Sequence, residues 1–579
     1  MASFTFDKLC FETTTKSPVK CESITRSFNG EVSKYKLKIE YDGEVMPEEY
    51  TITWYEPLID TLAFWSPMHH FESYLRPDWS MNTANSKLTS GMPVCALVNK
   101  QGTNKLTIAF SDPKIPVSLK AGVVEENSTL KYEIRLFTEK TAKISSYEAE
   151  FLLDYRELPY SKTIKDVSIW WGEYGYTHAY TPREAKMPLY SAWYSFHQDT
   201  IPEKIIKECK VAKSLGMEVL IVDDGWQTDD GARGYGYCGD WEVCENKIPS
   251  MKDFVNDVHA LGMKFMLWFS VPFVGIYSKN YKRFEGMYLK SKPRMNAMVL
   301  DPRFPEVREF LVSTYERFVN DYQIDGLKLD FIDDFTLSES SSENYEKMTT
   351  TSVDEAIEIL LSEISQRLKS INPDFLIEFR QSYVGPAISK YGNMFRVGDC
   401  PNDPLVNRTH SLNMRLALLN SAVHSDMLMW NKDEKNEALM YQLLGIMFTV
   451  PQISVRFDNI TSDHKKILKN FLDFWSSHKE TILEGEIQVE DMEANYTKAS
   501  ATGKNEVVEV LYQQGITSLH NSFKTYIFNA TGKDVVYIDS TRQALYEVYN
   551  MFGEKINSGI ASMGVNKINS PNGGMISIY

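Results

Sequence analysis

The sequence is poor in the features that mark disulfide-stabilised, membrane-spanning and nucleic-acid-binding proteins. Its seven cysteines are scattered (positions 10, 21, 95, 209, 238, 244 and 400) and form no C-x-x-C pair, so neither a disulfide framework nor a structural zinc site is indicated. It has no run of 18 apolar residues, so no membrane span is predicted. The net charge of −16 makes nucleic acid and anionic membranes poor partners.

The first residues, MASFTFDKLCFETT, also have no basic stretch followed by an apolar run. We therefore expect no signal peptide and a cytoplasmic location. What the chain does have is length and aromatic residues. Its 579 residues exceed what one hydrophobic core organises, and aromatic residues make up 13% of them. Flat aromatic rings often serve as platforms for sugars, although they have many structural uses as well.

The first part of the chain is predicted to be a β-sandwich. In "KYKLKIEY", Tyr35, Leu37, Ile39 and Tyr41 alternate with charged residues, as in a strand with one face in solvent. The segments 106–110 and 131–137 are similar, with turn-forming residues between them.

From about residue 185, short apolar strands alternate with amphipathic helices. Helices are predicted over 202–215, up to Gly262, from Pro305, and after the capping box of Ser352 and Glu355. There are eight strand candidates, and they cover residues 188–196, 218–226, 264–271, 326–332, 375–379, 393–399, 424–430 and 451–457. This alternation predicts a (β/α)8 barrel.

After about residue 480 the pattern returns to β, at 506–512, 524–530, 534–540 and 574–579. We therefore predict three domains. They are an N-terminal β-sandwich over 1–175, a catalytic (β/α)8 TIM barrel over 176–480 and a small C-terminal β-sandwich over 481–579.

Charged or aromatic residues stand at the ends of six consecutive predicted strands, where a barrel carries its chemistry. They are Asp223 and Asp224, Trp268, Lys328 and Asp330, Glu378 and Arg380, Arg396 and Asp399, and Asp426 and Trp430.

Lys328 and Asp330 are two apart on one strand, so their side chains share a face and point into the mouth of the barrel. A neighbouring ammonium lowers the pKa of a carboxyl, and an ionised, fixed aspartate suits a nucleophile. The alternative is a buried Lys–Asp ion pair with a purely structural role.

A second carboxyl is needed for acid/base work, and Asp399, two strands further round, is the best candidate. Asp403 in the same loop is a weaker one. Asp399 could instead form a loop turn or a helix cap. Two carboxyls flanking one bond are the minimum equipment for hydrolysis of a glycoside.

Six motifs in order carry a resemblance to a known family: "VDDGWQ", "GDWEVCENKIPS", "LWF", "LDPRFPEVREF", "GLKLDF" and "FRVGDCP". Over about residues 185–480 the chain resembles glycoside hydrolase family 36, the α-galactosidase or melibiase family. The flanking β domains agree with that family's layout.

The resemblance implies a role for each matching residue. Asp330 is implied as the nucleophile and Asp399 as the acid/base. Asp223 and Asp224 correspond to the pair that grips the sugar hydroxyls, Lys328 to a lysine on the ring hydroxyls and Trp268 to the platform under the sugar. Arg396 corresponds to the arginine shortly before the acid/base. Trp193, on the first strand, and Trp65, from the N-terminal domain, are candidate extra walls, although Trp65 could equally belong to the sandwich core.

Three positions depart from the family pattern. Arg380 and Ser382 stand where many members have a cysteine and a glycine near the sugar 2-position, and Ile332 stands where many have an asparagine. We include Arg380 among the substrate-binding candidates. These departures leave the reaction class unchanged but affect which sugar fits.

The resulting hypothesis is a retaining α-galactosidase that acts on carbohydrate and needs no metal or cofactor. An α-N-acetylgalactosaminidase, another α-glycosidase or a transglycosidase would use the same chemistry. From other classes, a metal-dependent lyase or isomerase barrel and a non-catalytic sugar-binding protein stay open. A homo-oligomer is also left open.

Overall fold

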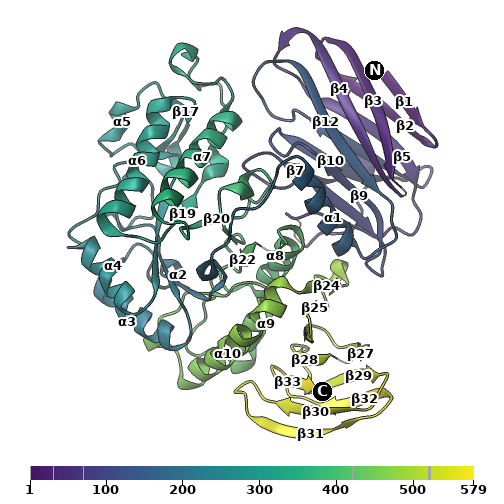
Figure 1. The fold of residues 1–579 in the computed structure, drawn as a ribbon, viewed down its shortest axis with the longest axis vertical. Coiled ribbons are helices and arrows are strands. Elements are labelled where there is room, and N and C mark those ends of the chain that lie inside the picture. The colour runs from purple at the N-terminus through teal and green to yellow at the C-terminus, as the bar shows by residue number, and fades with distance from the viewer. Residues whose placement is uncertain (1, 30, 69–70, 420, 520–522) are drawn as a thin grey trace.

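The computed structural model describes residues 2–29, 31–68, 71–419, 421–519 and 523–579. The chain forms an N-terminal pair of sheets, a central barrel with surrounding helices and a C-terminal β region (Figure 1). Among the described residues, no helix is long and apolar enough to cross a membrane.

The N-terminal region is a sandwich of two six-stranded sheets. One sheet has the order β1-β2-β5-β11-β10-β7 and the other β3-β4-β12-β9-β8-β6. The predicted alternation holds in β4 (Val32–Val45), where Tyr35, Leu37, Ile39 and Tyr41 are all buried. The remaining strands are β1 Ala2–Phe6, β2 Leu9–Thr15, β3 Val19–Asn29, β5 Tyr50–Pro57, β6 Ala63–Trp65, β7 Asn82–Ser86, β8 Val94–Val98, β9 Asn104–Phe110, β10 Val117–Val124, β11 Thr129–Leu136 and β12 Ile144–Asp154.

The central sheet has eight parallel strands in the order β22-β21-β20-β19-β15-β14-β13-β23. Its two edge strands are joined by parallel bridges between His424 and Val450 and between Leu428 and Ile453, which close the barrel. The strands are β13 Leu189–Ser191, β14 Val219–Val222, β15 Lys264–Ser270, β19 Gly326–Asp330, β20 Leu376–Arg380, β21 Met394–Arg396, β22 Ala422–His424 and β23 Gln452–Ile453. Each lies within one of the predicted segments, except that β20 runs one residue further and β22 begins two residues earlier.

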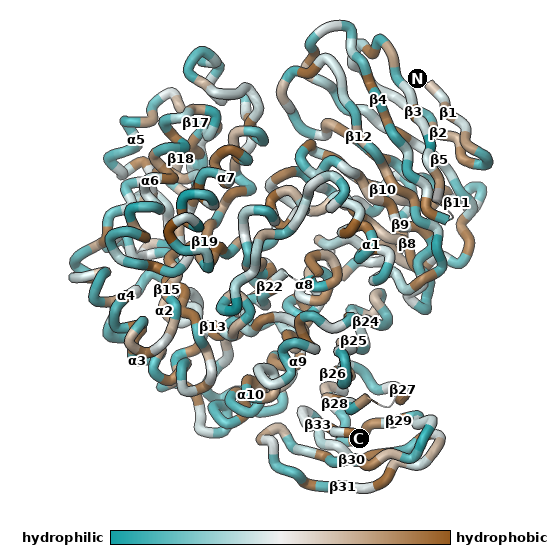
Figure 2. The backbone as a smooth tube through the Cα atoms, in the orientation of Figure 1, coloured by the Kyte–Doolittle hydropathy of each residue, from teal (hydrophilic) through white to brown (hydrophobic). Residues whose placement is uncertain are grey.

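Helices surround the barrel, and the first four of those named next lie where the amphipathic patterns predicted them. The main ones are α3 Pro202–Ser214, α4 Met251–Ala260, α6 Pro305–Tyr322, α7 Val353–Ile371, α8 Pro404–Ala417, α9 Asn436–Gly445 and α10 Ser462–Glu484. At the start of α7, Ser352 accepts a hydrogen bond from the amide of Glu355, as the capping motif predicts. Hydrophobic residues lie along the barrel strands, whereas hydrophobic and hydrophilic residues alternate along the surrounding helices (Figure 2).

Two parts of the fold were not expected from the sequence. A helix, α1 (Tyr160–Glu173), links the sandwich to the barrel, and a small sheet of β16 Phe273–Gly275, β18 Ala297–Leu300 and β17 Tyr288–Lys292 interrupts the alternation after β15. The boundary predicted at 480 falls inside α10, which ends at Glu484.

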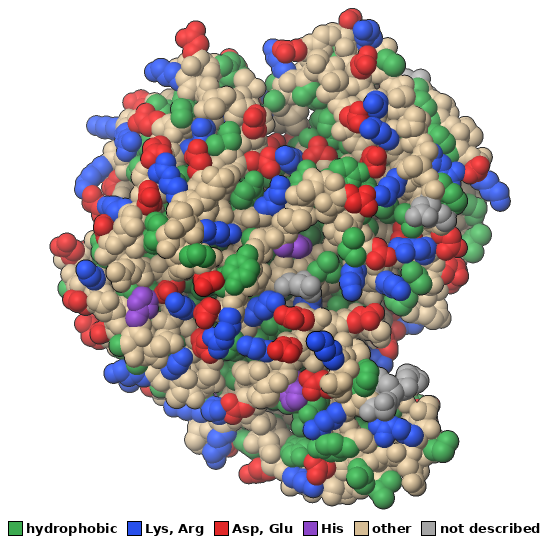
Figure 3. Space-filling model, viewed as in Figure 1, with side chains coloured by type: hydrophobic (Ala, Val, Ile, Leu, Met, Phe, Trp, Pro, Cys, Tyr) green, Lys and Arg blue, Asp and Glu red, His purple; other side chains and the backbone are tan. Residues whose placement is uncertain are grey.

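The C-terminal region has a seven-stranded sheet, β24-β25-β26-β28-β33-β30-β31, and a three-stranded sheet, β27-β29-β32. Its strands are β24 Glu486–Glu490, β25 Lys498–Thr502, β26 Glu506–Leu511, β27 Ile516–Leu519, β28 Lys524–Asn529, β29 Val535–Ser540, β30 Ala544–Tyr549, β31 Lys555–Ala561, β32 Gly564–Asn569 and β33 Met575–Ile578. The face of the whole molecule seen in Figure 3 mixes acidic and basic side chains without a large area of one sign.

Candidate active site at the barrel mouth

The carboxyl ends of the barrel strands, here called the barrel mouth, bring the predicted charged residues together. Parallel pairing sets Trp268 of β15 level with Lys328 of β19, and Lys328 level with Glu378 of β20. Two positions further along the same strands lie Asp330 and Arg380. The register therefore places Lys328 and Glu378 in one layer, and Asp330 and Arg380 in the next layer toward the carboxyl end of the barrel.

Lys328 makes its direct ion pair with Asp223, not with Asp330 as its position on the strand suggested. The Lys328 Nζ to Asp223 Oδ2 distance is 2.5 Å and both side chains are buried. Burial alone would lower the pKa of Lys328, but the negative charges of Asp223, Glu378 and Asp330 together outweigh it and the pKa is raised. Lys328 is therefore a fixed cation, anchored to the neighbouring strand.

Asp330 is held by groups from β15, from β20 and from the turn after its own strand. Its Oδ1 accepts from Arg380 Nε at 2.5 Å and from the amide of Phe331 at 2.8 Å, and its Oδ2 accepts from Trp268 Nε1 at 3.1 Å. Burial opposes ionisation of this carboxyl. The charges of Arg380 and Lys328 outweigh burial, and the pKa of Asp330 falls to about 2. Asp330 is thus an ionised carboxylate near neutral pH, as the sequence predicted, but Arg380 is the closer cation.

The "DDGW" turn after β14 fixes Asp224. Its two oxygens accept from Gln198 Nε2 at 2.6 Å and from Gln227 Nε2 at 2.7 Å, and burial raises its pKa to about 6. Gly225 has a φ of +112°, and a Cβ there would meet the backbone of Gln198 at 2.5 Å. Glycine is required at this position because only it combines the left-handed backbone with so close an approach. Lys247 donates to the carbonyls of Gln198 and Gly225 and ties the turn down.

Three buried tryptophans pack beneath this turn. Trp226 stacks on Trp241 with ring centroids 5.9 Å apart, and Trp241 meets Trp268 edge-on at 6.2 Å. Trp226 Nε1 also donates to the carbonyl of Trp268 at 2.9 Å. Trp268 is therefore held from its backbone and from its ring, with its Nε1 directed at Asp330.

Arg396 links the second candidate carboxyl to the barrel. Its Nη1 lies 2.8 Å from Asp399 Oδ1 and 2.7 Å from Asp426 Oδ1. The Asp399 side chain is 55% exposed, whereas Asp426 is fully buried. Asp399 lies three residues beyond the end of β21, and the charge of Asp330 acts on it. The two proposed catalytic carboxyls are thus close enough for the charge of one to influence the pKa of the other.

The pKa values of Asp399 and Asp426 move in opposite directions. Burial raises the pKa of both carboxyls, but at Asp399 the charges of Arg396 and Lys328 outweigh it and the pKa is lowered. At Asp426 burial prevails and the pKa is raised, despite hydrogen bonds from Tyr194 Oη and the amide of Cys400. The ligand-free protein therefore holds both Asp330 and Asp399 in the ionised form near neutral pH.

The two candidate wall tryptophans differ in position. Trp193 begins a short helix, α2 (Trp193–Phe196), just after β13 rather than lying on the strand, and it packs against His197 at 4.6 Å. Trp65 has no exposed surface. Its Nε1 donates to Asn413 Oδ1 of α8 at 2.9 Å and its ring lies 6.1 Å from Tyr160, a placement that favours a structural role.

Asp403, the weaker acid/base candidate, caps helix α8. Its Oδ1 accepts from the amides of Leu405 and Val406 at 3.1 and 3.0 Å. The helix-cap alternative weighed for Asp399 therefore applies to Asp403. The pattern of Asp followed by Pro404 at the first helical position was a usable sequence signal for this cap.

Sequence reasoning did not single out several residues that shape the mouth. Tyr383 donates to the carbonyl of Leu329 at 2.7 Å and reaches Asp330 Oδ1 at 3.4 Å. Tyr235 stacks on Trp268 at 6.1 Å, and Gln198 holds Asp224. All three lie in loops outside the strand pattern, so periodicity gave no signal for them.

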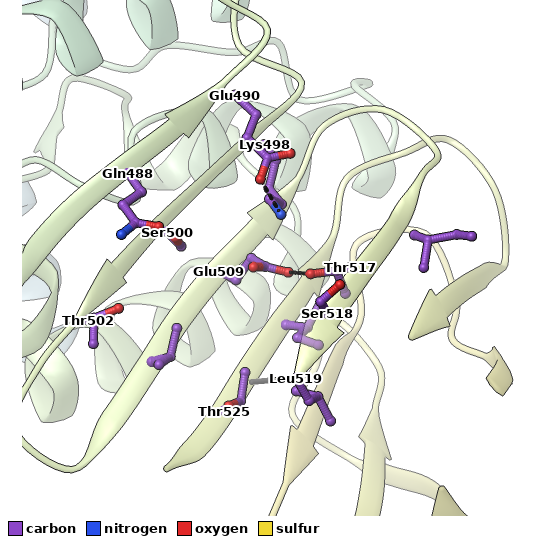
Figure 4. A pocket seen from close by; sticks show the side chains of 13 residues that line it. Gln488, Glu490, Lys498, Ser500, Thr502, Glu509, Thr517, Ser518, Leu519 and Thr525 are labelled. Atoms are coloured by element: carbon purple, nitrogen blue, oxygen red, sulfur yellow. Dashed lines mark hydrogen bonds and ion pairs between the residues drawn. The ribbon is translucent and has the colours of Figure 1, made fainter. Parts of the chain in front are cut away.

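A separate cavity of about 380 Å³ lies in the C-terminal β region, between β27 and the large sheet (Figure 4). Its carboxylates are engaged locally, Glu490 with Lys498 and Glu509 with Thr517. It lacks the convergence of charged residues from many strands that the barrel mouth has. Within the described ranges, no group of three or more His, Cys, Asp or Glu side chains is arranged to hold a metal ion.

Comparison with known proteins matches part of the barrel to a family model. The model of the family described as Melibiase matches residues 176–386, which include β13 to β20 of the barrel and Asp330. Over these residues the chain is similar to melibiases. The chain is similar to the α-galactosidase AgaA of Geobacillus stearothermophilus, with 29% identity over 160 residues, covering 26% of this chain and 21% of AgaA. It is also similar to the α-galactosidase Mel36A of Lactobacillus acidophilus, with 30% identity over 149 residues, covering 24% of this chain and 19% of Mel36A. These alignments span about a fifth of the length of each relative.

Solved structures share the fold of this chain over most of its length. The α-galactosidase from Lactobacillus brevis aligns with a TM-score of 0.63 at 14% identity, covering 100% of this chain and 82% of that one. A variant of AgaA in complex with 1-deoxygalactonojirimycin aligns with a TM-score of 0.64 at 17% identity, covering 96% and 81%. The TIM-barrel prediction with flanking β domains is confirmed.

Proposed function

We propose that this protein is a retaining α-galactosidase that removes terminal α-galactosyl residues from oligosaccharides or glycoconjugates. The observation that carries the proposal is the state of Asp330, an ionised carboxylate at the barrel mouth within the electrostatic reach of a half-exposed Asp399. In support, AgaA variants have been solved in complex with raffinose and with stachyose. The proposed catalytic domain is the barrel, with the N- and C-terminal β regions as separate domains.

In the proposed mechanism, Asp330 attacks the anomeric carbon while the glycosidic C–O bond breaks. The bonding electron pair goes to the leaving oxygen, which takes a proton from Asp399. Water, deprotonated by Asp399, then displaces Asp330 and restores both groups. For this double displacement the two carboxyl groups are expected to be about 5–5.5 Å apart.

Asp399 needs a proton for the first step, and its lowered pKa in the free protein works against this. A bound sugar would displace water from the half-exposed side chain and so raise its pKa. We propose that Asp223 and Asp224 hold the sugar hydroxyls, with Lys328 and Trp268 beside them. The ion pair of Lys328 and Asp223 then presents both a donor and an acceptor to the sugar.

The test is a panel of nitrophenyl α-glycosides that includes the galactoside and the N-acetylgalactosaminide, with the first product followed by NMR. We expect the α-galactoside to be turned over fastest and the α-anomer to be released first. Release of the β-anomer would contradict the retaining mechanism, and faster turnover of another glycoside would reassign the sugar. Tight binding without turnover across the panel would favour a sugar-binding protein.

A further inference from the structure

The two oxygens of Asp330 have different environments. Oδ1 accepts from Arg380 Nε at 2.5 Å and the Phe331 amide at 2.8 Å, with Tyr383 Oη at 3.4 Å. Oδ2 accepts only from Trp268 Nε1, at 3.1 Å, among the hydrogen bonds of the described residues. Since each carboxylate oxygen offers about two lone-pair sites, Oδ1 is saturated and Oδ2 keeps one site open.

Arg380 is itself fixed in place. Its Nη1 donates to the carbonyl of Gln381 at 3.0 Å, and its Nη2 lies 3.6 Å from Asp333 Oδ1. Its guanidinium carbon also lies over the rings of Phe331 and Tyr383, at 5.3 and 5.6 Å. A planar guanidinium held by hydrogen bonds and by two ring faces loses little further freedom when it binds a carboxylate.

We propose that Arg380 is a positioning residue that clamps Oδ1 of Asp330 and leaves Oδ2 as the oxygen that attacks the anomeric carbon. The proposal rests on the proposed function, because it concerns the nucleophile of that reaction. It gives Arg380 a role different from the substrate contact that its sequence position suggested. In the reaction, Oδ2 bonds to the anomeric carbon as the glycosidic C–O bond breaks and its electron pair goes to the leaving oxygen, which takes the proton of Asp399. The Asp330 carboxylate thereby becomes a neutral ester beside Arg380.

The clamp also controls the charge of Asp330. Burial favours the neutral carboxyl, and Arg380 is the largest of the opposing influences that bring its pKa to about 2. The other ionisable groups that act on Asp330 or lie around it come from several strands and loops. They are Lys328, Asp333, Asp399, Tyr235 and Tyr383. Of these groups only Lys328 is a cation, and its charge already contributes to the lowered pKa of Asp330. When Arg380 is removed, no other group among these supplies a positive charge in its place.

The test compares the wild type with Arg380→Gln and Arg380→Lys, using Arg283→Gln as a matched control. Arg283 is half exposed and pairs with Glu306, and among the described residues none of the groups that surround Asp330 is its partner. With nitrophenyl α-galactoside, Arg380→Gln should lower kcat by about a hundredfold, because the nucleophile loses its alignment. It should also bring an acid limb into the profile of kcat/KM against pH, since the pKa of Asp330 rises once the guanidinium is gone. The wild type should show no such limb above pH about 3.

A second measurement needs no substrate. In the wild type the folded-state pKa of Asp330 lies below its unfolded value of about 3.9, so its ionisation stabilises the fold above that pH and this stabilisation is lost as pH falls. In Arg380→Gln the folded-state pKa of Asp330 moves up toward its unfolded value. Less stability is therefore lost in this variant as the pH falls. The gap in urea midpoint between the two proteins should therefore narrow from pH 6 to pH 3. The control should run parallel to the wild type.

The outcomes separate the possibilities. Arg380→Gln could raise KM without an acid limb and with urea midpoints that run parallel to those of the wild type from pH 6 to pH 3. This result would show that Arg380 contacts the substrate and would overturn the clamp. If Arg380→Gln does not fold, Arg380→Lys provides the test. A loss of kcat in Arg380→Lys, with no acid limb in the profile of kcat/KM against pH, supports the clamp. An unchanged kcat in Arg380→Lys overturns it. If the wild type turns over no glycoside, the proposed function fails, while the stability curves still test the clamp.

Discussion

At the scale of single residues, Asp330 determines whether the chemistry proposed here occurs. Replacing it by Asn keeps the shape but removes the negative charge and the nucleophilic oxygen. We expect Asp330→Asn to lower kcat by on the order of 10⁴-fold or more, because a missing nucleophile leaves only binding and electrostatic effects. Far-UV circular dichroism should stay unchanged. Asp458→Asn, at an exposed pair with Lys207, is the control and should keep full activity. Substantial activity in Asp330→Asn would rule out its role as nucleophile.

The buried pair of Lys328 and Asp223 gives a second prediction at this scale. Lys328→Met should lower the free energy of unfolding by about 3–5 kcal/mol, because it leaves Asp223 buried without its partner. Lys204→Met, which removes an exposed pair with Asp199, should cost no more than about 1 kcal/mol. Urea unfolding of both variants measures the difference. Equal small losses would mean that water reaches Asp223 in solution.

The identity of the mouth residues was predictable, whereas their partners were not. A period of two along the strands and the position of the strand ends brought Asp223, Lys328, Asp330 and Arg380 to one place. Which cation meets which carboxylate depends on the register between neighbouring strands and on rotamers, neither of which a single sequence displays. For this reason Lys328 was expected beside Asp330, but it pairs with Asp223.

At the scale of elements, the loop between β21 and α8 separates a proposed catalytic carboxyl from a helix cap. Asp403→Ala removes the cap of α8 and should cost about 1 kcal/mol of stability while leaving turnover nearly intact. Asp399→Ala should keep its stability, since the Asp399 side chain is half exposed, but should lose activity. Its turnover should fall by about 10²–10⁴-fold. Added azide should restore product from an activated substrate as the α-galactosyl azide.

Urea midpoints and kcat, measured for Asp403→Ala and Asp399→Ala, test these two predictions. The reverse result, with turnover lost in Asp403→Ala and kept in Asp399→Ala, would move the acid/base role to Asp403.

The barrel elements were predictable because their signals are local. Apolar runs marked the strands, and Pro202, Pro305 and Ser352 marked helix starts. Helix α1 and the small β16–β18 sheet were missed for a physical reason. The two tryptophans of α1, Trp170 and Trp171, are buried against other parts of the molecule, and the small sheet pairs three strands of only three to five residues. In both cases tertiary packing rather than local periodicity selects the structure.

At the scale of the whole molecule, Trp65 marks the junction of the three parts of the chain. It comes from β6 of the N-terminal sandwich and donates to Asn413 of the barrel helix α8. The hydroxyl of Tyr496, from the start of the C-terminal region, donates to the same oxygen of Asn413. Since Asn413 Oδ1 accepts from both neighbours, one buried polar group links all three parts. The stability of the barrel should therefore depend on its β neighbours.

Trp65→Ala tests this dependence against the proposal that Trp65 is a wall of the sugar site. Because the side chain is fully buried, its removal leaves a cavity and takes away one of the two donors to Asn413 Oδ1. It should cost about 3–5 kcal/mol in the free energy of unfolding. Trp79→Ala in the same domain is the matched control, since Trp79 is 77% exposed and should change stability by no more than about 0.5 kcal/mol. Thermal unfolding and the KM for nitrophenyl α-galactoside are measured on both. A higher KM without loss of stability in Trp65→Ala would return this residue to the sugar site, because only a side chain that touches substrate weakens binding while the fold stays intact.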